Sequence, residues 1–203
     1  INMKFLFDLG GVFFDWDPNY FYKDIFETDE ERIYFLNKVC TNEWNIMQDA
    51  GRSIKEAEQE LLPKFPHYKK QIKMYYQNHR KMIKGTFGSS IKVFKSLIKN
   101  NYQCYVLSNW SAETFYGPDK SMIQDYPFLK EFNGLLISGE DKLIKPDLAI
   151  YRLAIKRFDL MPRETVFIDD KLENIEAAKI LNFKTIHLSN PETIEKEINK
   201  FLT

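Results

Sequence analysis

Short apolar runs that end abruptly at polar residues recur along the chain and predict buried parallel strands. We expect these strands at residues 3–7, 103–107, 134–137, 165–168 and 184–188. Most are separated by amphipathic segments, with apolar residues three or four positions apart around 91–98, 150–158 and 175–181. Asn190 and Pro191 suit the cap and first turn of a last helix. This alternation predicts an α/β fold with a mostly parallel sheet.

One long block, from about Pro18 to Gly85, shows helical periodicity and no convincing strand. Ser53 with Glu56 three positions later is typical of a capping box. Two apolar stripes follow the helical repeat: Ile33, Leu36, Val39 and Cys40 in the first, and Ile72, Tyr75, Tyr76, His79, Met82 and Ile83 in the second. We therefore expect an α/β core at 1–17 and 86–203, with an inserted all-helical cap at 18–85.

Composition excludes several classes of protein. With 44% hydrophobic and 29% charged residues, the 203-residue chain can bury a core and is not expected to be disordered. Lys plus Arg and Asp plus Glu number 29 each, which disfavours general binding to nucleic acid or anionic membranes. No stretch approaches the roughly 20 apolar residues of a membrane helix, and we see no secretory signal. Cys40 and Cys104 lack metal-binding spacing and suggest buried thiols in a reducing cytoplasm.

Polar residues that carry chemistry follow the expected strands: Asp8, Ser108, Asn109, Asp169 and Asp170, with Lys145 in a loop. In parallel sheets, ligands bind beyond the carboxyl ends of the strands, so these residues are the candidate site. The adjacent acids Asp169 and Asp170 repel each other unless a cation is near, and their oxygens suit Mg²⁺. Taken singly, Asp8 and the Ser108–Asn109 pair also fit capping roles, and Lys145 fits a solvated loop.

Four motifs in register with the expected strand ends strengthen the catalytic interpretation. They are Phe7–Val12 (FDLGGV), Val106–Asn109 (VLSN), Lys145–Pro146, and Val166–Asp170 (VFIDD) with Asn174 beyond it. In this order and spacing, the chain resembles the haloacid dehalogenase-like (HAD) hydrolase superfamily, in the subgroup whose helical cap follows the first motif. The resemblance spans almost the whole chain and implies a Rossmann-like core.

The resemblance also implies roles for individual residues. Asp8 would be the nucleophile that forms an aspartyl-phosphate. Mg²⁺ would be held by Asp8, the Gly10 carbonyl and Asp170, with Asp169 as a ligand or just behind the ligands. Ser108 and Lys145 would hold the phosphoryl oxygens, beside Gly10, Gly11 and Asn109. Neutralising cations are needed because an anionic nucleophile approaches an anionic substrate.

Position 10 departs from the pattern of most phosphatases of this superfamily. They usually carry a second Asp two residues after the nucleophile, as the acid for the leaving group, whereas this chain has Gly10. General acid catalysis typically contributes about 10²–10⁴-fold. We therefore expect a preference for anomeric, acyl or aryl phosphates over simple alkyl phosphates. A cap residue such as Glu43 or His79 is an alternative proton source that would remove this preference.

The leading hypothesis is Mg²⁺-dependent hydrolysis of a phosphate monoester of a small metabolite, because chains with a Phe-Asp-Leu-Gly start resemble phosphatases that include sugar-1-phosphate phosphatases. Two alternatives remain: a 2-haloacid dehalogenase-type hydrolase, and a catalytically weakened binding protein of the same fold. The expected partner is a small phosphorylated metabolite, and the chain is expected to be a monomer or homodimer. Trp16, Tyr20, Trp44 and Met47 are candidates either for lining the pocket or for plain packing, and Lys171 is expected to be solvated surface.

Overall fold

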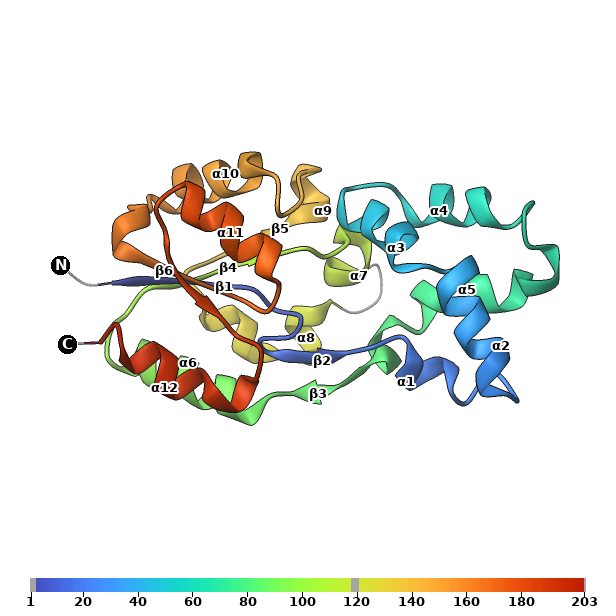
Figure 1. The fold of residues 1–203 in the computed structure, drawn as a ribbon, viewed down its shortest axis with the longest axis horizontal. Coiled ribbons are helices and arrows are strands. Elements are labelled where there is room, and N and C mark those ends of the chain that lie inside the picture. Colours follow the sequence, from blue (N-terminus) through green and yellow to red (C-terminus); the bar gives the residue numbers. More distant parts are fainter. Residues whose placement is uncertain (1–2, 118–120, 203) are drawn as a thin grey trace.

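A parallel sheet of five strands forms the centre of the computed structural model, which describes residues 3–117 and 121–202 (Figure 1). The strand order is β5-β4-β1-β6-β7, and all neighbouring pairs are parallel. The bounds are β1 (Lys4–Phe7), β4 (Cys104–Ser108), β5 (Gly134–Ile137), β6 (Thr165–Asp169) and β7 (Lys184–His187). Every strand expected from the apolar runs is therefore present, to within one residue at each end.

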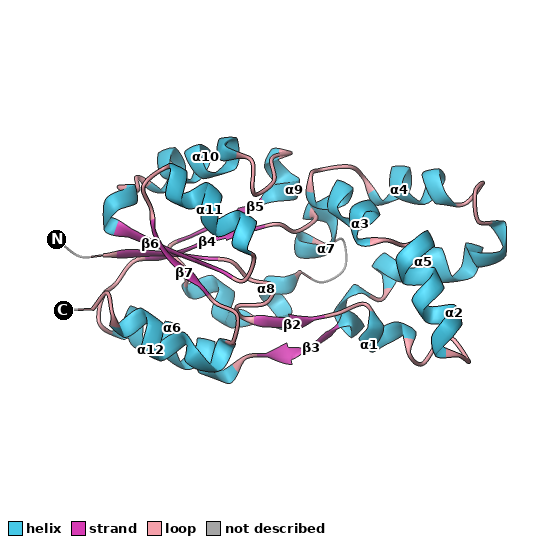
Figure 2. Ribbon diagram, in the orientation of Figure 1, coloured by secondary structure: helices cyan, strands magenta, loops and turns pink. Residues whose placement is uncertain are grey.

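Helices cover both faces of this sheet, as Figure 2 shows. α6 (Gly88–Lys99) and α12 (Ile194–Asn199) lie on one face, and α10 (Leu148–Phe158) and α11 (Leu172–Ile180) lie on the other. Successive side chains of a strand point to opposite faces. Accordingly, Phe5 and Phe7 of β1 pack in the cluster beneath α6, whereas Leu6 packs in the cluster beneath α10.

Short elements connect the main strands and helices on the core side. These are α7 (Ala112–Tyr116), α8 (Met122–Asp125) and α9 (Ser138–Asp141), with 3₁₀ turns at Pro127–Glu131, Pro162–Glu164 and Pro191–Thr193. Asn190 caps the last of these turns, because its side chain accepts a hydrogen bond from the Glu192 amide at 3.0 Å. The expected start of the last helix is therefore confirmed, with one 3₁₀ turn before α12.

The segment between β1 and α6 is mostly helical and has its own hydrophobic cluster, built around Tyr22, Phe35 and Tyr75. Its helices are α1 (Asn19–Tyr22), α2 (Asp29–Tyr34), α3 (Asn42–Asp49), α4 (Ile54–Leu61) and α5 (Lys69–Gln77), with a π-helical turn at Phe35–Val39 and 3₁₀ turns at Pro66–Tyr68 and His79–Met82. Figure 1 places these helices beyond the carboxyl ends of the sheet strands.

A two-stranded antiparallel ribbon joins the helical segment to the core. β2 (Phe14–Trp16) precedes α1, and its partner β3 (Ile83–Thr86) precedes α6. The expectation of no strand before Gly85 is therefore wrong at its last residues. The ribbon is short, and the pairing of β2 with β3 shifts register between Asp15 and Trp16. Its two strands therefore leave no alternating apolar pattern in the sequence.

Two local features of the helical segment bear on the expectations, one against them and one in agreement. Ile33 is 51% exposed and does not belong to the buried stripe, because the helix changes to a π turn at Phe35. The Ser53 side chain caps α4 by accepting a hydrogen bond from the Glu56 amide, as expected.

Cys40 and Cys104 are free and buried. Across the described ranges, none of the helices has the length and apolar character that a membrane crossing requires.

Candidate active site

Three polar residues meet at the carboxyl edge of the sheet because β1 lies between β4 and β6. Asp8 follows β1, Ser108 ends β4 and Asp169 ends β6. The Asp8 amide continues the ladder by donating to the Ile168 carbonyl at 2.9 Å. The sheet therefore fixes the Asp8 backbone next to the end of β6, as the apolar runs predict.

Lys145 forms the centre of a buried charge cluster. Its Nζ lies 3.0 Å from Asp8 Oδ1 and 2.7 Å from Asp169 Oδ2, and it donates to the Leu107 carbonyl at 2.9 Å. Burial opposes the charged form, but Asp169 and Asp8 outweigh it and raise the pKa of Lys145 above its ordinary value. The side chain is thus a permanent ammonium between two carboxylates.

Asn109 holds the backbone of the loop that carries Lys145. Its Oδ1 accepts from the Lys145 amide at 2.9 Å, and its Nδ2 donates to the Lys145 carbonyl at 3.0 Å. Both ends of the amide are thereby used, so Asn109 positions the lysine. Asn109 also lines the cavity, so its expected contact with a phosphate group stays a prediction.

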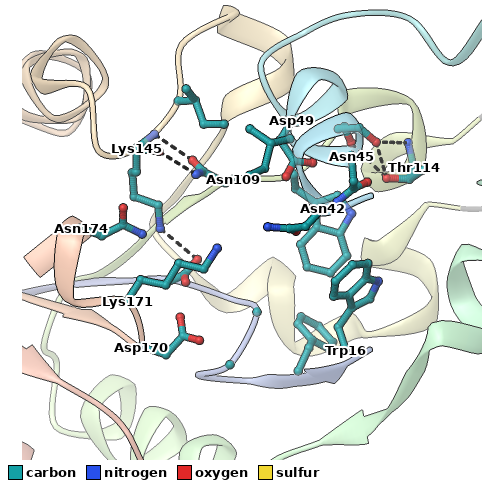
Figure 3. Close-up of a pocket in the computed structure, with 18 of the residues that line it drawn as sticks. Trp16, Asn42, Asn45, Asp49, Asn109, Thr114, Lys145, Asp170, Lys171 and Asn174 are labelled. Atoms are coloured by element: carbon teal, nitrogen blue, oxygen red, sulfur yellow. Dashed lines mark hydrogen bonds and ion pairs between the residues drawn. The ribbon is translucent and has the colours of Figure 1, made fainter. Parts of the chain in front are cut away.

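Asp169 is fully buried and does not line the cavity described below. It accepts from Asn174 Nδ2 at 3.1 and 3.2 Å and from the Lys171 amide at 2.9 Å, in addition to Lys145. These contacts occupy both of its oxygens. Asp169 therefore anchors Lys145 from behind, while the neighbouring Asp170 faces the cavity (Figure 3).

The carboxylates of Asp8 and Asp170, with Asp169 beside them, fit a divalent cation. Asp8, Asp169 and Asp170 each offer an oxygen within 4.8 Å of the others. Asp170 Oδ1 is buried and has no hydrogen-bond partner among the described residues. Burial first, and then Asp169, raises the pKa of Asp8 to about 8 against the opposing effect of Lys145. One ammonium is therefore too little positive charge here, and an all-oxygen donor set suits Mg²⁺.

The two glycines after Asp8 have different environments. Gly11 has φ +77°, and a Cβ at this position would lie 2.2 Å from Asp170 Oδ2. By contrast, a Cβ at Gly10 would meet nothing within 4 Å. Gly11 is thus required for the turn that brings the backbone against Asp170, whereas Gly10 leaves open space beside the nucleophile.

A cavity of about 600 Å³ opens above these residues, between the core and the helical segment. Asp8, Gly10, Asp170 and Lys171 lie on its core side. The opposite side comes from α3, whose Asn42, Asn45 and Asp49 face Lys171 and Asp170 across the cavity (Figure 3). Aromatic residues complete the wall: Phe14, Trp16, Tyr76, His79, Phe87 and Trp110. The lining therefore combines aromatic faces with amide and carboxyl groups.

Ser108 is buried, and its Oγ has no hydrogen-bond partner among the described residues. An unpaired buried hydroxyl costs free energy unless a ligand completes it. Its place at the end of β4, next to Asp8, agrees with the expected contact to a bound anion.

Several expectations for the pocket wall are corrected. Trp16 lines the cavity as expected, but Trp44 is buried among the cap helices and Met47 is 48% exposed outside the lining. Tyr20 also lies outside the lining, and its hydroxyl donates to Asp15 at 2.7 Å. Lys171 is exposed, as expected, and it also lines the cavity.

The two cap residues named as alternative proton sources do not suit that role. Glu43 is exposed and absent from the cavity lining. His79 does line the cavity, but burial and then Arg80 lower its pKa to about 3, so its imidazole is neutral. The sequence gives no sign of Asp49, Asn42 or Asn45 as site residues, because they lie on a helix without a chemical motif.

Comparison with known proteins identifies the family. Residues 19–188 match the family described as haloacid dehalogenase-like hydrolase. The chain belongs to this family. The sesquiterpene phosphatase astK of Aspergillus oryzae is 24% identical over 187 residues, which cover 91% of this chain and 89% of that phosphatase. This chain covers only 7%, 35% and 52% of the length of three further curated relatives.

Solved HAD structures share the fold. A protein described as a predicted HAD-like family hydrolase from Porphyromonas gingivalis superposes with a TM-score of 0.72 at 22% identity, covering 99% of this chain and 98% of the other. A HAD family enzyme of Bacteroides thetaiotaomicron, solved in complex with magnesium and inorganic phosphate, gives a TM-score of 0.64 at 21% identity, with 92% and 93% covered. The expected Rossmann-like α/β fold is confirmed.

Proposed function

We propose that this HAD hydrolase is a Mg²⁺-dependent phosphatase that hydrolyses a phosphate monoester of a small metabolite. The observation that carries this proposal is the buried Lys145 ammonium, held 3.0 Å from Asp8 and 2.7 Å from Asp169 at the base of the cavity. A nucleophilic carboxylate beside a fixed cation suits attack on an anionic ester. The phosphatase and phosphate-bound relatives support the same reaction class.

Asp8 is the proposed nucleophile. Its Oδ1 accepts from the Leu9 amide at 2.8 Å and pairs with Lys145, while Oδ2 has no hydrogen-bond partner within the described part of the chain. Oδ2 attacks phosphorus, the bond from phosphorus to the ester oxygen breaks, and that oxygen leaves with the electron pair. Water then attacks the phosphorus of the aspartyl-phosphate, which regenerates Asp8 and releases phosphate. Lys145 and Ser108 Oγ bind the phosphoryl oxygens in both steps.

Asp8, the Gly10 carbonyl and Asp170 are the proposed ligands of Mg²⁺, with Asp169 behind them. When bound, Mg²⁺ adds the positive charge that favours ionised Asp8 and neutralises the phosphoryl oxygens. The unpartnered Oδ1 of Asp170 and the raised pKa of Asp8 support this assignment.

Residues 18–85 are the proposed cap, and the core comprises 1–17 and 86–203. The cap supplies the wall of the cavity that faces the nucleophile. Trp16 and Trp110 offer flat apolar faces, and Asn42 and Asn45 offer hydrogen bonds to hydroxyl groups. A sugar or polyol phosphate, which includes the sugar 1-phosphates, is therefore the proposed substrate class.

A phosphate-ester screen with and without Mg²⁺ tests this function, using wild type and Asp8→Asn. We expect Mg²⁺-dependent phosphate release by wild type and less than a few per cent of it by the variant. Release of halide from 2-haloacids without Mg²⁺ would instead indicate a dehalogenase. No turnover of any aryl, alkyl or sugar phosphate would indicate a binding protein.

A further inference from the structure

We propose that Asp49 of the cap is the general acid that protonates the departing ester oxygen, in place of the acid that is absent at position 10. This inference rests on the proposed phosphatase function. Asp49 is the last residue of α3, and it lines the cavity together with Asp8 and Gly10. Figure 3 shows it on the cap side, across the cavity from Asp170 and Lys171.

The volume beside Gly10, where an acid usually stands, is open. A Cβ at Gly10 would meet nothing within 4 Å, so no neighbouring group of the core fills that volume. The leaving group of a substrate bound by its phosphate at Lys145 projects from the core towards the cap. An acid placed on the cap can therefore reach the ester oxygen from the far side of the cavity.

The other carboxylates that line the cavity are committed or unsuitable. Asp8 and Asp170 belong to the proposed nucleophile and metal site. Asp15 accepts a hydrogen bond from the Tyr20 hydroxyl at 2.7 Å. Glu173 is exposed in the first turn of α11. Asp49 is the carboxylate left among the described lining residues.

The cap and core hold the α3 end in place. The Asp49 carbonyl accepts from Ser138 Oγ of the core at 2.5 Å. The charged and titratable groups facing the Asp49 side chain are Lys171 and Lys145 from the core and Tyr75 and Tyr76 from α5. The Ser111 backbone and both lysines favour the charged form of Asp49.

Burial outweighs these opposing groups and raises the pKa of Asp49 to about 7. The side chain is therefore protonated over much of the range near and below neutral pH, as an acid must be. In the first step, its proton moves to the ester oxygen as the bond from phosphorus to that oxygen breaks, which releases the alcohol and leaves Asp49 as a carboxylate. In the second step, that carboxylate takes a proton from the attacking water, and Asp49 is again neutral.

The test compares two substrates of different leaving-group acidity, 4-nitrophenyl phosphate and glycerol phosphate, in wild type and Asp49→Asn. We expect Asp49→Asn to lower kcat/KM for glycerol phosphate by about 10²–10⁴-fold, and for 4-nitrophenyl phosphate far less. Wild-type kcat on glycerol phosphate should fall as the pH rises past about 7, and the variant should lack this decline. Adding Gly10→Asp to Asp49→Asn should restore part of the lost glycerol phosphate turnover.

Glu43→Gln is the matched control, since it changes an exposed acid of the same helix and should leave the ratio of the two substrates unchanged. Equal losses on both esters would overturn the proposal, because they indicate a binding or folding role for Asp49. A wild type that discriminates strongly against glycerol phosphate, as the absence of an acid at position 10 alone predicts, would also overturn it. So would a ratio that responds to Asp15→Asn instead. If Asp8→Asn retains full activity, the proposed function itself fails, independently of Asp49.

Discussion

At the residue scale, Gly10 and Gly11 are neighbours with opposite tolerance for a side chain. We expect Gly11→Ala to lower kcat at least tenfold and to destabilise the fold by about 1–3 kcal/mol, because its backbone is left-handed and its Cβ would displace Asp170. Gly10→Ala has free space around its Cβ, so its thermal midpoint should stay close to wild type. Steady-state kinetics and thermal melts of both variants check this, and equal behaviour of the pair would contradict it.

His79 should make stability depend on pH. Its folded pKa of about 3 lies below the ordinary value of 6.5, so the unfolded chain binds a proton that the folded chain does not. The stability present above pH 6.5 is therefore lost as the pH falls towards 3. His79 alone contributes a loss of about 2 kcal/mol at pH 5, while the raised pKa values of Asp8 and Asp49 act in the opposite direction. Urea unfolding at pH 7 and pH 5 gives the difference in unfolding free energy between the two pH values, which should shift by about this amount from wild type in His79→Asn, but not in the exposed control His67→Asn.

At the scale of elements, the cap is held against the core by a few identifiable hydrogen bonds. The Ile54 amide at the start of α4 donates to Glu113 Oε2 of α7 at 2.7 Å. Ser138 Oγ of α9 donates to the carbonyl of Asp49, the last residue of α3. Both covalent connections between the cap and the core pass through the β2–β3 ribbon. We therefore expect the cap to rotate as a unit about this ribbon between open and closed states.

Removing Glu113 should favour the open state. Hydrogen bonds to charged groups contribute about 1.5–3 kcal/mol, so Glu113→Ala should speed amide exchange at Ile54 about tenfold or more. Hydrogen–deuterium exchange of a peptide covering residues 50–57 measures this. Glu176→Ala, which removes an exposed acid of α11, is the control and should leave exchange in the cap unchanged. Unchanged exchange in Glu113→Ala would show that this contact does not hold the cap.

At the scale of the whole molecule, metal binding should couple to stability. A ligand at 100 times its Kd stabilises the folded state by about 2.7 kcal/mol, which corresponds to about 5 °C or more for a chain of this length. Saturating Mg²⁺ should therefore raise the thermal midpoint of wild type and of Asp159→Asn, an exposed control outside the cavity. Asp170→Asn should lose most of this increase. A Mg²⁺ effect of equal size in Asp170→Asn would contradict the assigned ligand.

The sequence predicted the parts of the site that the sheet itself positions. Asp8, Ser108 and Asp169 follow buried apolar runs, and parallel strands bring such ends to one edge. Lys171 is exposed as expected, but the sequence did not indicate that it also lines the cavity, because that depends on how the loop after β6 folds. Asp49 carried no signal at all, since its role depends on how the cap packs on the core. The β2–β3 ribbon was missed because its strands are only partly buried and their pairing shifts register between Asp15 and Trp16, so neither strand is an apolar run.

The β2–β3 ribbon also has a consequence for how such an enzyme diversifies. The chain enters and leaves the helical segment through adjacent strands, with Phe14 opposite Thr86. An insertion whose two ends nearly coincide can be lengthened, shortened or exchanged by recombination without altering the order of the parallel strands. If Asp49 is the acid, it belongs to the exchangeable part, whereas Asp8 belongs to the fixed part. One recombination event would then change both the molecules recognised and the leaving groups that can be expelled, while the nucleophile is inherited unchanged.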